Sequence, residues 1–494
     1  MNYTHKLLLS LLGVFCFSLI QVKAKAFSPI DFGLLEARNG VERYEALLRC
    51  HKQALQGNGS VSYMGLDSIY LEIPVRANSI PLTEKTDFCG VRIIVKNQSK
   101  DIFLFTMEHI FLPINLTAHQ IDEGDLTTCA SLAQGSYIII VEDKKPWVEE
   151  RIGYGYPHIR KDILLVKNGR AKNRPVMPYN NKHSNPFCTY RKVSNQEKTI
   201  SNLHFYRTHD STKNTGLIKV NGEHNLKIKN VYVFTPSGNN MYGDRVIEVS
   251  NSSSVTYEDI TVEGTYSRED EFGYAFSLNN VWNYTARSVR ADANWGVYGT
   301  NNLNKVLLEK CKINRFDIHC YGRDVTMKKC CFFKLYNSFG ATFGNIYFDQ
   351  CIFDGSIPYL NAGSYNTFVK TKIIFNKCEF CLTNSTNFLV WMMGMKTDIN
   401  SRPELSNKYL PDISLKRCEV NVPNDVNEWY LYRLDSYRND LIVEGGNTVN
   451  VDNLHINGNT QSEAHLQTDK IELRKPINVR LKKVLAGGCK TVIK

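Results

Sequence analysis

The stretch VLLEKCKI at Val306–Ile313 decides the fold, because its pattern recurs along the chain. Apolar residues stand five and three positions before a cysteine, and another apolar residue follows the cysteine two positions later. Such alternation is typical of a short strand with one buried face. Five copies end in cysteine: VLLEKCKI (306–313), VTMKKCCF (325–332), IYFDQCIF (346–353), IIFNKCEF (373–380) and ISLKRCEV (413–420).

The same pattern continues on both sides with an aliphatic residue in place of the cysteine. We call the residue at this position, cysteine or aliphatic, the anchor. Val231, Ile260 and Val289 are earlier anchors, and Leu454 is a weaker later one. Successive anchors lie 19 to 40 residues apart, a spacing typical of solenoid coils with inserted loops. One strand motif for each period of about 20 residues favours a β-helix over a propeller. We therefore predict an all-β fold, a right-handed parallel β-helix over residues 201–460. The right-handed sense is inferred from the known handedness of parallel crossover connections.

The five cysteine anchors predict a ladder of thiols inside this helix. Parallel coils stack about 4.8 Å apart, so equivalent side chains of successive coils touch. Free cysteine behaves as a small hydrophobe in such positions. The five anchors contain no Cys-x-x-Cys pair, which argues against a zinc site. Outside the ladder, Cys89 and Cys129 could form a disulfide.

The ends of the chain predict export and two caps. Lys6, the apolar run Leu7–Ile20 and small residues up to Ala26 indicate a signal peptide over residues 1–26. A lipoprotein signal using Cys16 is the alternative, although Phe15 is not the small residue expected before it. Residues 27–200 predict an N-terminal α/β cap with the first coils, or a separate small β domain, and residues 461–494 predict a C-terminal cap. We expect a monomer in the periplasm, on the cell surface or outside the cell.

A net charge of +11 is spread over the whole chain without a dense block of Lys and Arg. It fits either simple solubility or attraction to an acidic polymer. Nucleic acid is a poor candidate, because the sequence has no basic helix and no recognised RNA-binding motif.

The residues Arg315-Phe316-Asp317-Ile318-His319 alternate polar and apolar side chains. In an extended strand, Arg315, Asp317 and His319 share the outer face while the two apolar residues point into the core. Aligning coils by their anchors adds further residues to this row. It places Lys334 over Arg315 and Tyr336 over Asp317. In the preceding coil, Trp295 follows its anchor by the same number of residues as Asp317 does, and Asp292, Tyr298 and Asn301 lie close to it along the chain.

These side chains suit an acidic polysaccharide, because aromatic rings stack on sugars and cations hold carboxylates or sulfates. In a β-elimination, His319 would be the base and Arg315 or Lys334 would neutralise the uronate carboxylate. Tyr336 would protonate the leaving oxygen, and Asp317 would orient its neighbours. A glycoside hydrolase needs two carboxylates, for which Asp317 and Asp292 are the nearest pair. A plain ladder of surface ion pairs is the alternative without function.

Two further segments bear on the site. Tyr430–Arg438 is rich in tyrosine, and its Tyr432 and Arg433 could extend a binding groove, or the segment could be a packed strand. Tyr266–Tyr274 carries the acidic run Glu269–Glu271, which could bind calcium. The sequence requires no cofactor, and no histidine spacing typical of a metal site occurs.

The segments Trp295-Gly-Val-Tyr-Gly-Thr-Asn301 and Arg315-Phe-Asp-x-His319 resemble exported right-handed parallel β-helix proteins of gut Bacteroidetes, related to the pectate-lyase-like superfamily. The resemblance covers residues 60–460. It implies polysaccharide processing, with lyases of acidic polymers such as glycosaminoglycans a prominent activity. The chain lacks the paired aspartates and Gly-His-Gly segment of polygalacturonases and the Trp-x-Asp-His motif of pectate lyases, which weakens pectin as a substrate.

The sequence therefore predicts a polysaccharide lyase that cleaves a uronate-containing glycan, such as chondroitin sulfate or hyaluronan, by β-elimination. A non-catalytic glycan-binding β-helix and a glycoside hydrolase of the same fold are the alternatives. Only the fold follows from the repeat itself.

Overall fold

A computed structural model describes most of the chain after residue 24. The described ranges are 25–74, 76–96, 102–144, 159–180, 184–208, 215–234, 246–263, 274–292, 295–334, 336–340, 342–360, 371–394, 410–436, 442–443, 446–459, 461–466, 472–473, 475–486 and 489–490. The expected signal peptide, up to residue 24, and the acidic run at 269–271 lie outside them.

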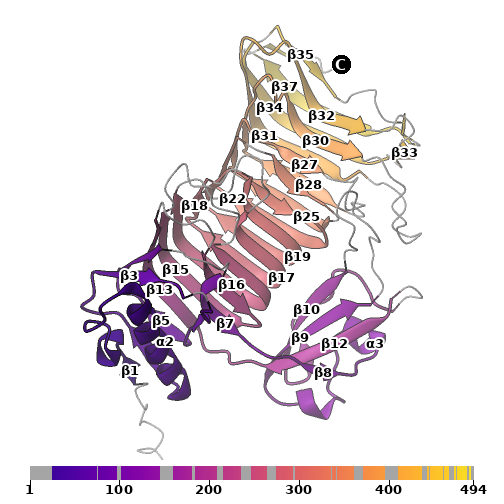
Figure 1. The fold of residues 1–494 in the computed structure, drawn as a ribbon. Coiled ribbons are helices and arrows are strands. Elements are labelled where there is room, and N and C mark those ends of the chain that lie inside the picture. The colour runs from indigo at the N-terminus through magenta and orange to yellow at the C-terminus, as the bar shows by residue number, and fades with distance from the viewer. Residues whose placement is uncertain are drawn as a thin grey trace, which may run out of the picture.

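The described strands stack into a column, in which each strand pairs in parallel with its equivalent one coil further along (Figure 1). The column has three faces, and the long strands β16 (Ile247–Glu263), β17 (Tyr274–Arg287) and β19 (Gly296–Glu309) each pass from one face to another. This architecture confirms the predicted all-β parallel β-helix.

The first face carries the candidate site and is built from one short strand of each coil. Its members besides the N-terminal parts of β16, β17 and β19 are β4 (Ile80–Pro81), β7 (Ile102–Glu108), β14 (Thr215–Asn221), β21 (Phe316–Ile318), β24 (Asn337–Phe339), β27 (Pro358–Leu360), β30 (Phe388–Gly394), β32 (Glu428–Ser436) and β35 (Glu463–His465).

The second and third faces follow in the same coil. The second contains β1 (Ala26–Phe27), β2 (Ser60–Ser62), β5 (Lys85–Asp87), β13 (Lys198–Arg207), β15 (His224–Phe234), β22 (Gly322–Lys328), β25 (Thr342–Asp349), β28 (Lys372–Asn376), β31 (Asp412–Val422), β34 (Thr448–Gly458) and β37 (Asn478–Ala486). The third contains β3 (Ser68–Glu72), β6 (Arg92–Lys96), β18 (Arg290–Ala291), β20 (Lys312–Ile313), β23 (Cys331–Phe333), β26 (Ile352–Asp354) and β29 (Glu379–Cys381), with the C-terminal parts of β13, β15, β16, β31 and β34.

The core of the column consists of like side chains stacked coil on coil. Phe332, Phe353 and Phe380 form one such stack, with ring centroids 5.3 and 4.9 Å apart. The cysteine anchors form another, and all five are buried free thiols: Cys311, Cys330, Cys351, Cys378 and Cys418. Burial raises the pKa of Cys351 well above its ordinary value, which keeps that thiol protonated. The predicted ladder is therefore confirmed.

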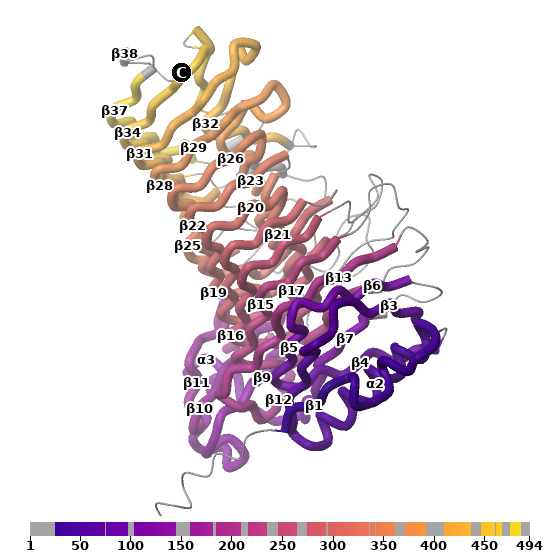
Figure 2. Tube along the Cα trace, turned by 90° about the vertical axis from the view of Figure 1, so that its left-hand side faces the viewer, coloured from indigo at the N-terminus to yellow at the C-terminus, as the bar shows by residue number. Residues whose placement is uncertain are grey.

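The coils extend beyond residues 201–460 at both ends, from β2 to β37. Helix α2 (Gly40–Gln56) lies at the N-terminal end of the column (Figure 2). The helix begins after Asn39, because the Asn39 side chain accepts a hydrogen bond from the Glu42 amide at 2.9 Å. Strands β3, β6 and β7 belong to the first coils.

Between β7 and β13 the chain forms a separate small sheet, which we call the insert. Its antiparallel strands are β8 (Leu112–Ile114), β9 (Ser136–Asp143), β10 (Lys161–Lys167), β11 (Arg170–Ala171) and β12 (Pro186–Lys192), joined by α3 (Ala118–Glu123). The insert is held to the column by Lys161, whose amide donates to Asn302 Oδ1 at 3.0 Å, and by Arg323, which donates to the Pro175 carbonyl. The region before residue 200 thus contains both expected alternatives, first coils and a small β unit.

Cys89 and Cys129 do not form the disulfide considered from the sequence, since both thiols are free. Cys89 follows a strand of the column and Cys129 lies in the insert. No helix among the described residues is long and apolar enough to cross a membrane.

Replacing a ladder thiol should destabilise the column. Cys351→Ser places a hydroxyl in an apolar stack, and we expect the free energy of unfolding to fall by about 1–3 kcal/mol. Cys381→Ser, at a half-buried thiol outside the ladder, should cost less than about 0.5 kcal/mol. Urea unfolding measures both, and equal effects of the two variants would contradict a packing role for the ladder.

His51 on α2 should make the N-terminal end sensitive to acid. Burial lowers the pKa of His51 to about 4, and its ring contacts Tyr63 Oη at 2.8 Å and the Pro81 carbonyl at 3.0 Å. In the unfolded chain, His51 takes up a proton at about pH 6.5. The contribution of neutral His51 to the free energy of unfolding is therefore complete above that pH and disappears as the pH falls toward 4. The loss amounts to about 3 kcal/mol.

Comparing the pH dependence of unfolding in the wild type, His51→Gln and the exposed control His455→Gln measures this contribution. The slope between about pH 6.5 and 4 should flatten in His51→Gln alone. A slope unchanged in that variant would show that His51 is not the responsible group.

Candidate active site

The first face of coils β19, β21 and β24 brings the predicted Arg-x-Asp-x-His row together. Phe316 and Ile318 are fully buried in the core, so the alternating residues between and beside them point outward, as the sequence predicts. Asp317 stands beside Gly299 of β19, and Ile318 stands beside Thr300. On the other side Ile318 pairs with Phe339 of β24.

This register corrects the alignment made from the anchors. Ile318 comes seven residues after its anchor Cys311, whereas its partner Phe339 comes nine residues after Cys330. The turn before β24 is therefore longer by two residues, which shifts the whole strand. Tyr336 lies over Arg315 rather than over Asp317, and Lys334 lies in the preceding turn.

The other alignment errors have the same cause. Gly299, and not Trp295, stands beside Asp317. The residue beside Asp317 in the following coil is Ser338, whose amide donates to Asp317 Oδ1 at 3.0 Å.

Arg315 is held in a clamp of two rings and one carboxylate. Its Nε lies 2.6 Å from Asp317 Oδ2, and its guanidinium lies 4.3 Å from the Trp295 ring centroid and 4.9 Å from that of Tyr336. The side chains of Arg315 and Asp317 are only 7% and 0% exposed. Burial alone would lower the pKa of Arg315, but the interactions with Asp317, Tyr274 and Tyr336 together outweigh it and the pKa is raised. The pair is thus a fixed, charged element of the face.

Tyr274 links Asp317 to His319. Its hydroxyl lies 2.6 Å from Asp317 Oδ2 and 2.9 Å from His319 Nε2. Burial and the Asp317 carboxylate raise the pKa of Tyr274 well above its ordinary value, so the phenol keeps its single proton. An ionised Asp317 can only accept, so Tyr274 donates to it and His319 Nε2 donates to Tyr274. This chain sets the histidine tautomer, with the proton on Nε2.

Two glycines of the Trp-Gly-x-x-Gly motif make room for this arrangement. A Cβ on Gly299 would overlap the Tyr274 ring, and one on Gly296 would lie 3.1 Å from both Arg315 and Tyr274. The motif therefore lets Tyr274 lie against the strand and reach Asp317. Sequence reasoning missed Tyr274, because it lies at the edge of the Tyr266–Tyr274 segment considered only as a loop.

Two predicted binding residues lie inside the core. Tyr298 is fully buried and shares a hydrogen bond of 2.9 Å with the Tyr284 hydroxyl, and Tyr432 is equally buried. Both predictions were wrong because strand alternation points these rings inward; Gly299 and Arg433 are their outward neighbours. For Tyr430–Arg438, the described strand β32 therefore combines core packing at Tyr432 with an outward Arg433.

The remaining predicted residues lie at the two edges of the first face. Lys334 and Asp292 form an exposed ion pair at the turns that lead into the face. Asn301 lies at the opposite edge, beside His319, and its amide donates to Asn279 Oδ1 at 3.1 Å.

Aromatic side chains continue the clamp toward the C-terminal coils. Tyr336 lies 4.9 Å from Tyr359 and 5.7 Å from Trp391, measured between ring centroids. Trp391 Nε1 donates to Asp435 Oδ2 at 3.0 Å, and the same carboxylate pairs with Arg433 at 2.7 Å. We call Trp295, Tyr336, Tyr359 and Trp391 the aromatic row.

The aromatic row ends at a second Arg-Asp pair that repeats the first. Arg433 and Asp435, like Arg315 and Asp317, are two residues apart on one strand, with an aromatic ring against the arginine. Recurrence of Arg-x-Asp in the sequence could have revealed Asp435, whereas Tyr359 and Trp391 carry no such signal.

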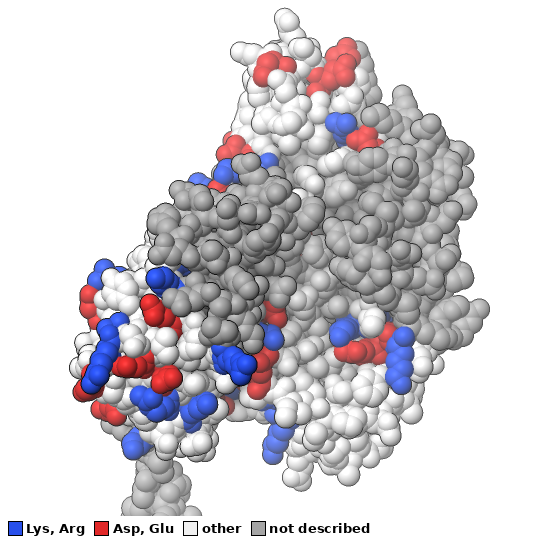
Figure 3. All heavy atoms as spheres, in the orientation of Figure 1, with Lys and Arg blue, Asp and Glu red and all other residues white. Residues whose placement is uncertain are grey.

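Figure 3 shows Lys and Arg beside Asp and Glu on the side of the molecule drawn there. Over the described ranges, no group of three or more His, Cys, Asp or Glu residues could hold a metal ion.

Comparison with known proteins adds to the fold. No protein-family model matches the sequence, and no curated protein matches it. Among solved structures, the tailspike protein gp49 from Pseudomonas phage LKA1 covers 94% of this chain and 83% of its own length, at 11% identity and a TM-score of 0.56.

Two weaker matches have TM-scores under 0.5 and carry no argument. A tailspike from an Acinetobacter baumannii bacteriophage covers 91% of this chain and 79% of its own length, at 8% identity and a TM-score of 0.48. A family 28 exopolygalacturonase from Yersinia enterocolitica covers 95% and 79%, at 10% identity and 0.36. The parallel coils and the likeness to the Pseudomonas phage tailspike define the fold of the chain as a right-handed parallel β-helix.

Removing Arg315 should destabilise the protein, contrary to what an exposed row would imply. Arg315→Ala leaves the fully buried Asp317 carboxylate without its cation, and we expect a loss of about 3–5 kcal/mol in the free energy of unfolding. Lys334→Ala removes one partner of an exposed pair and should cost less than about 1 kcal/mol. Denaturant unfolding compares them, and a small cost for both would show that the clamp is not a fixed element.

Proposed function

We propose that the protein is an exported polysaccharide lyase that cleaves a uronate-containing acidic glycan on the first face. The observation that carries the proposal is the hydrogen-bonded chain from Asp317 through Tyr274 to His319, beside the clamped Arg315. It supplies a positioned histidine of defined tautomer next to a fixed positive charge. Those are the two groups that removal of a proton beside a carboxylate needs.

His319 is the base in this mechanism. With one proton on Nε2, the Nδ1 lone pair of His319 takes the proton from the sugar carbon beside the uronate carboxylate. The electron pair of that C–H bond forms a double bond to the neighbouring carbon, and the bond from this carbon to the glycosidic oxygen breaks. Asp317 and Tyr274 hold the ring and stabilise the imidazolium that forms.

Arg315 and Lys334 stabilise the negative charge that develops on the carboxylate, Arg315 as a fixed charge and Lys334 as an exposed one. The half-buried Tyr336, whose ring lies over Arg315, protonates the departing glycosidic oxygen. His319 then returns the proton to Tyr336 through solvent, which restores both groups.

The aromatic row gives the polymer a surface to lie on. From β21 to β32 the first face crosses four strand spacings, or about 19 Å. Aromatic rings along this length stack on the apolar faces of successive sugars. The Arg433–Asp435 pair then contacts the glycan several sugars away from His319.

The burial of Arg315 and Asp317 also favours a second candidate, a non-catalytic glycan-binding β-helix. Both side chains are paired and enclosed, which suits a rigid recognition surface as well as a reaction site. A glycoside hydrolase ranks third, because the described carboxylates Asp317 and Asp435 are each engaged by an arginine rather than placed as an acid and base pair.

Incubating the purified protein with chondroitin sulfate, hyaluronan, heparin, pectin and alginate tests the proposal. We expect at least one polymer to yield the ultraviolet-absorbing unsaturated uronate that elimination produces. New reducing ends without this absorbance would establish hydrolysis instead. Binding without cleavage of any polymer would establish the recognition protein.

Variants of the histidine chain separate chemistry from binding. His319→Ala should lower kcat/KM by about 10²–10⁴-fold, and Tyr274→Phe should lower it about tenfold because the tautomer is no longer fixed. The control His455→Ala removes an exposed histidine of the third face and should leave kcat/KM unchanged. Full activity in His319→Ala would exclude it as the base.

A further inference from the structure

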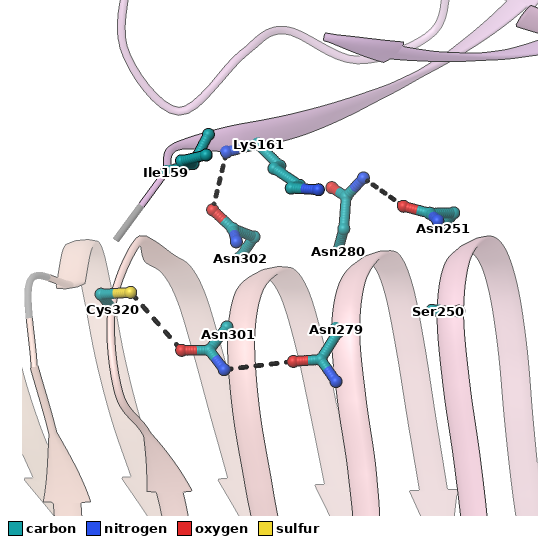
Figure 4. A pocket seen from close by; sticks show the side chains of 9 residues that line it. All are labelled: Ile159, Lys161, Ser250, Asn251, Asn279, Asn280, Asn301, Asn302 and Cys320. Atoms are coloured by element: carbon teal, nitrogen blue, oxygen red, sulfur yellow. Dashed lines mark hydrogen bonds between the residues drawn. The ribbon is translucent and has the colours of Figure 1, made fainter. Parts of the chain in front are cut away.

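A polar cavity of about 400 Å³ lies where the insert meets the column, at the edge of the first face (Figure 4). Its volume is in the range of small-molecule sites, about 300–1,000 Å³. Lys161 and Ile159 of the insert form one wall. The opposite wall is made of side-chain amides within β16, β17 and β19, where these strands leave the first face: Asn251, Asn279, Asn280, Asn301 and Asn302.

The amides form a directional ladder that is left open at the cavity. Asn251 donates to Asn221 Oδ1 at 2.9 Å, and Asn280 donates to Asn251 Oδ1 at 3.0 Å. The next rung would be Asn302, which shares the left-handed backbone conformation of Asn251 and Asn280. However, the Asn302 side chain is turned so that its Oδ1 accepts from the backbone amide of Lys161, and its amide nitrogen makes no hydrogen bond to Asn280 Oδ1.

Asn280 Oδ1 is consequently a buried acceptor without a hydrogen-bond partner, on a side chain that is 2% exposed. An unsatisfied buried acceptor costs about 1–3 kcal/mol. A ligand that offers a donor recovers this energy.

The cavity adjoins His319. Thr300 pairs with Ile318, so the outward residue Asn301 stands directly beside His319, one strand spacing of about 4.8 Å away. Cys320, which follows His319 in the chain, lines the cavity and lies 3.4 Å from Asn301 Oδ1. Asn279 continues the row beside Asn301. Amides therefore extend from the proposed base toward the N-terminal coils.

We infer that this cavity is a subsite for a neutral, hydroxyl-bearing sugar, bound next to the uronate that His319 attacks. The link to cleavage rests on the proposed function, whereas the binding of a neutral sugar does not. The substrate would then alternate acidic and neutral units, in contrast to a uronate homopolymer.

The lining chemistry selects a neutral sugar over an anion. Side-chain amides offer both donors and acceptors, which match hydroxyl groups that are donors and acceptors themselves. The group without a hydrogen-bond partner is the acceptor Asn280 Oδ1, which repels a carboxylate. Lys161, the cation of the wall, is paired with Glu142 at 2.6 Å. Among the described residues, no aromatic ring lines the cavity, in contrast to the aromatic row on the charged half of the face.

Ligand-observed saturation-transfer NMR on the full chain tests the subsite. The probes are glucose, galactose, N-acetylglucosamine and N-acetylgalactosamine, with glucuronate and galacturonate as charged counterparts. We expect saturable binding of at least one neutral sugar, weakened about tenfold in Asn280→Gly. Glycine retains the left-handed backbone conformation of residue 280 (φ 57°), so the variant removes only the amide.

Asn283→Gly is the matched control. Asn283 has a similar backbone conformation, with φ 61°, and donates to Ser254 of the preceding coil, but it does not line the cavity. Its variant should bind like the wild type. Lys161→Ala provides a second variant should Asn280→Gly fail to fold, because it leaves the amide ladder intact. It should also weaken binding, because it removes the side chain that forms one wall of the cavity.

The outcomes separate this inference from the proposed function. Absence of neutral-sugar binding, preference for glucuronate or galacturonate, or equal weakening in Asn283→Gly would overturn the subsite, whether or not the protein is a lyase. Neutral-sugar binding that depends on Asn280 would support it even if no polymer is cleaved. If cleavage occurs, hyaluronan, whose amino sugar is uncharged, should be preferred to alginate and polygalacturonate, and equal turnover of these uronate homopolymers would contradict the subsite.

Discussion

Parallel stacking of coils is the constraint on which the rest of this structure depends. Each strand bonds to its equivalent about 4.8 Å away, so a side chain stands beside the side chain at the same position of the next coil. Inside the column this produces stacks such as the cysteine ladder. On the first face it places Tyr336 against Arg315 and Asn301 beside His319. The core and the site are consequences of one register.

The sequence predicted the parts of this register that depend on burial. Cysteine and aliphatic anchors mark inward positions, so the fold, the thiol ladder and the outward row at Arg315 could be found from spacing. The turns between faces do not bury regular side chains, and two additional residues before β24 displaced Lys334 and Tyr336 from their expected places. Tyr298 and Tyr432 were misplaced because an aromatic residue suits both a core and a sugar site.

Contacts between distant segments were beyond the sequence. Tyr274 reaches Asp317 across more than forty residues because two glycines of β19 leave room for its ring. The cavity beside His319 lies where the insert meets the column and the backbone amide of Lys161 donates to Asn302. The first face thereby acquires two halves, one charged and aromatic and one lined by amides. This division accounts for a glycan with two kinds of unit better than for a uniform chain.

The central claim is that an acidic glycan lies along the first face, with its reacting uronate at His319. The most direct measurement is a crystal structure of the His319→Ala variant with a hyaluronan oligosaccharide. We expect a uronate between residue 319 and Arg315, its neutral neighbour among the amides of Asn279, Asn280 and Asn301, and further sugars along the aromatic row. An oligosaccharide bound on another face, or with its neutral unit over Arg315, would contradict it.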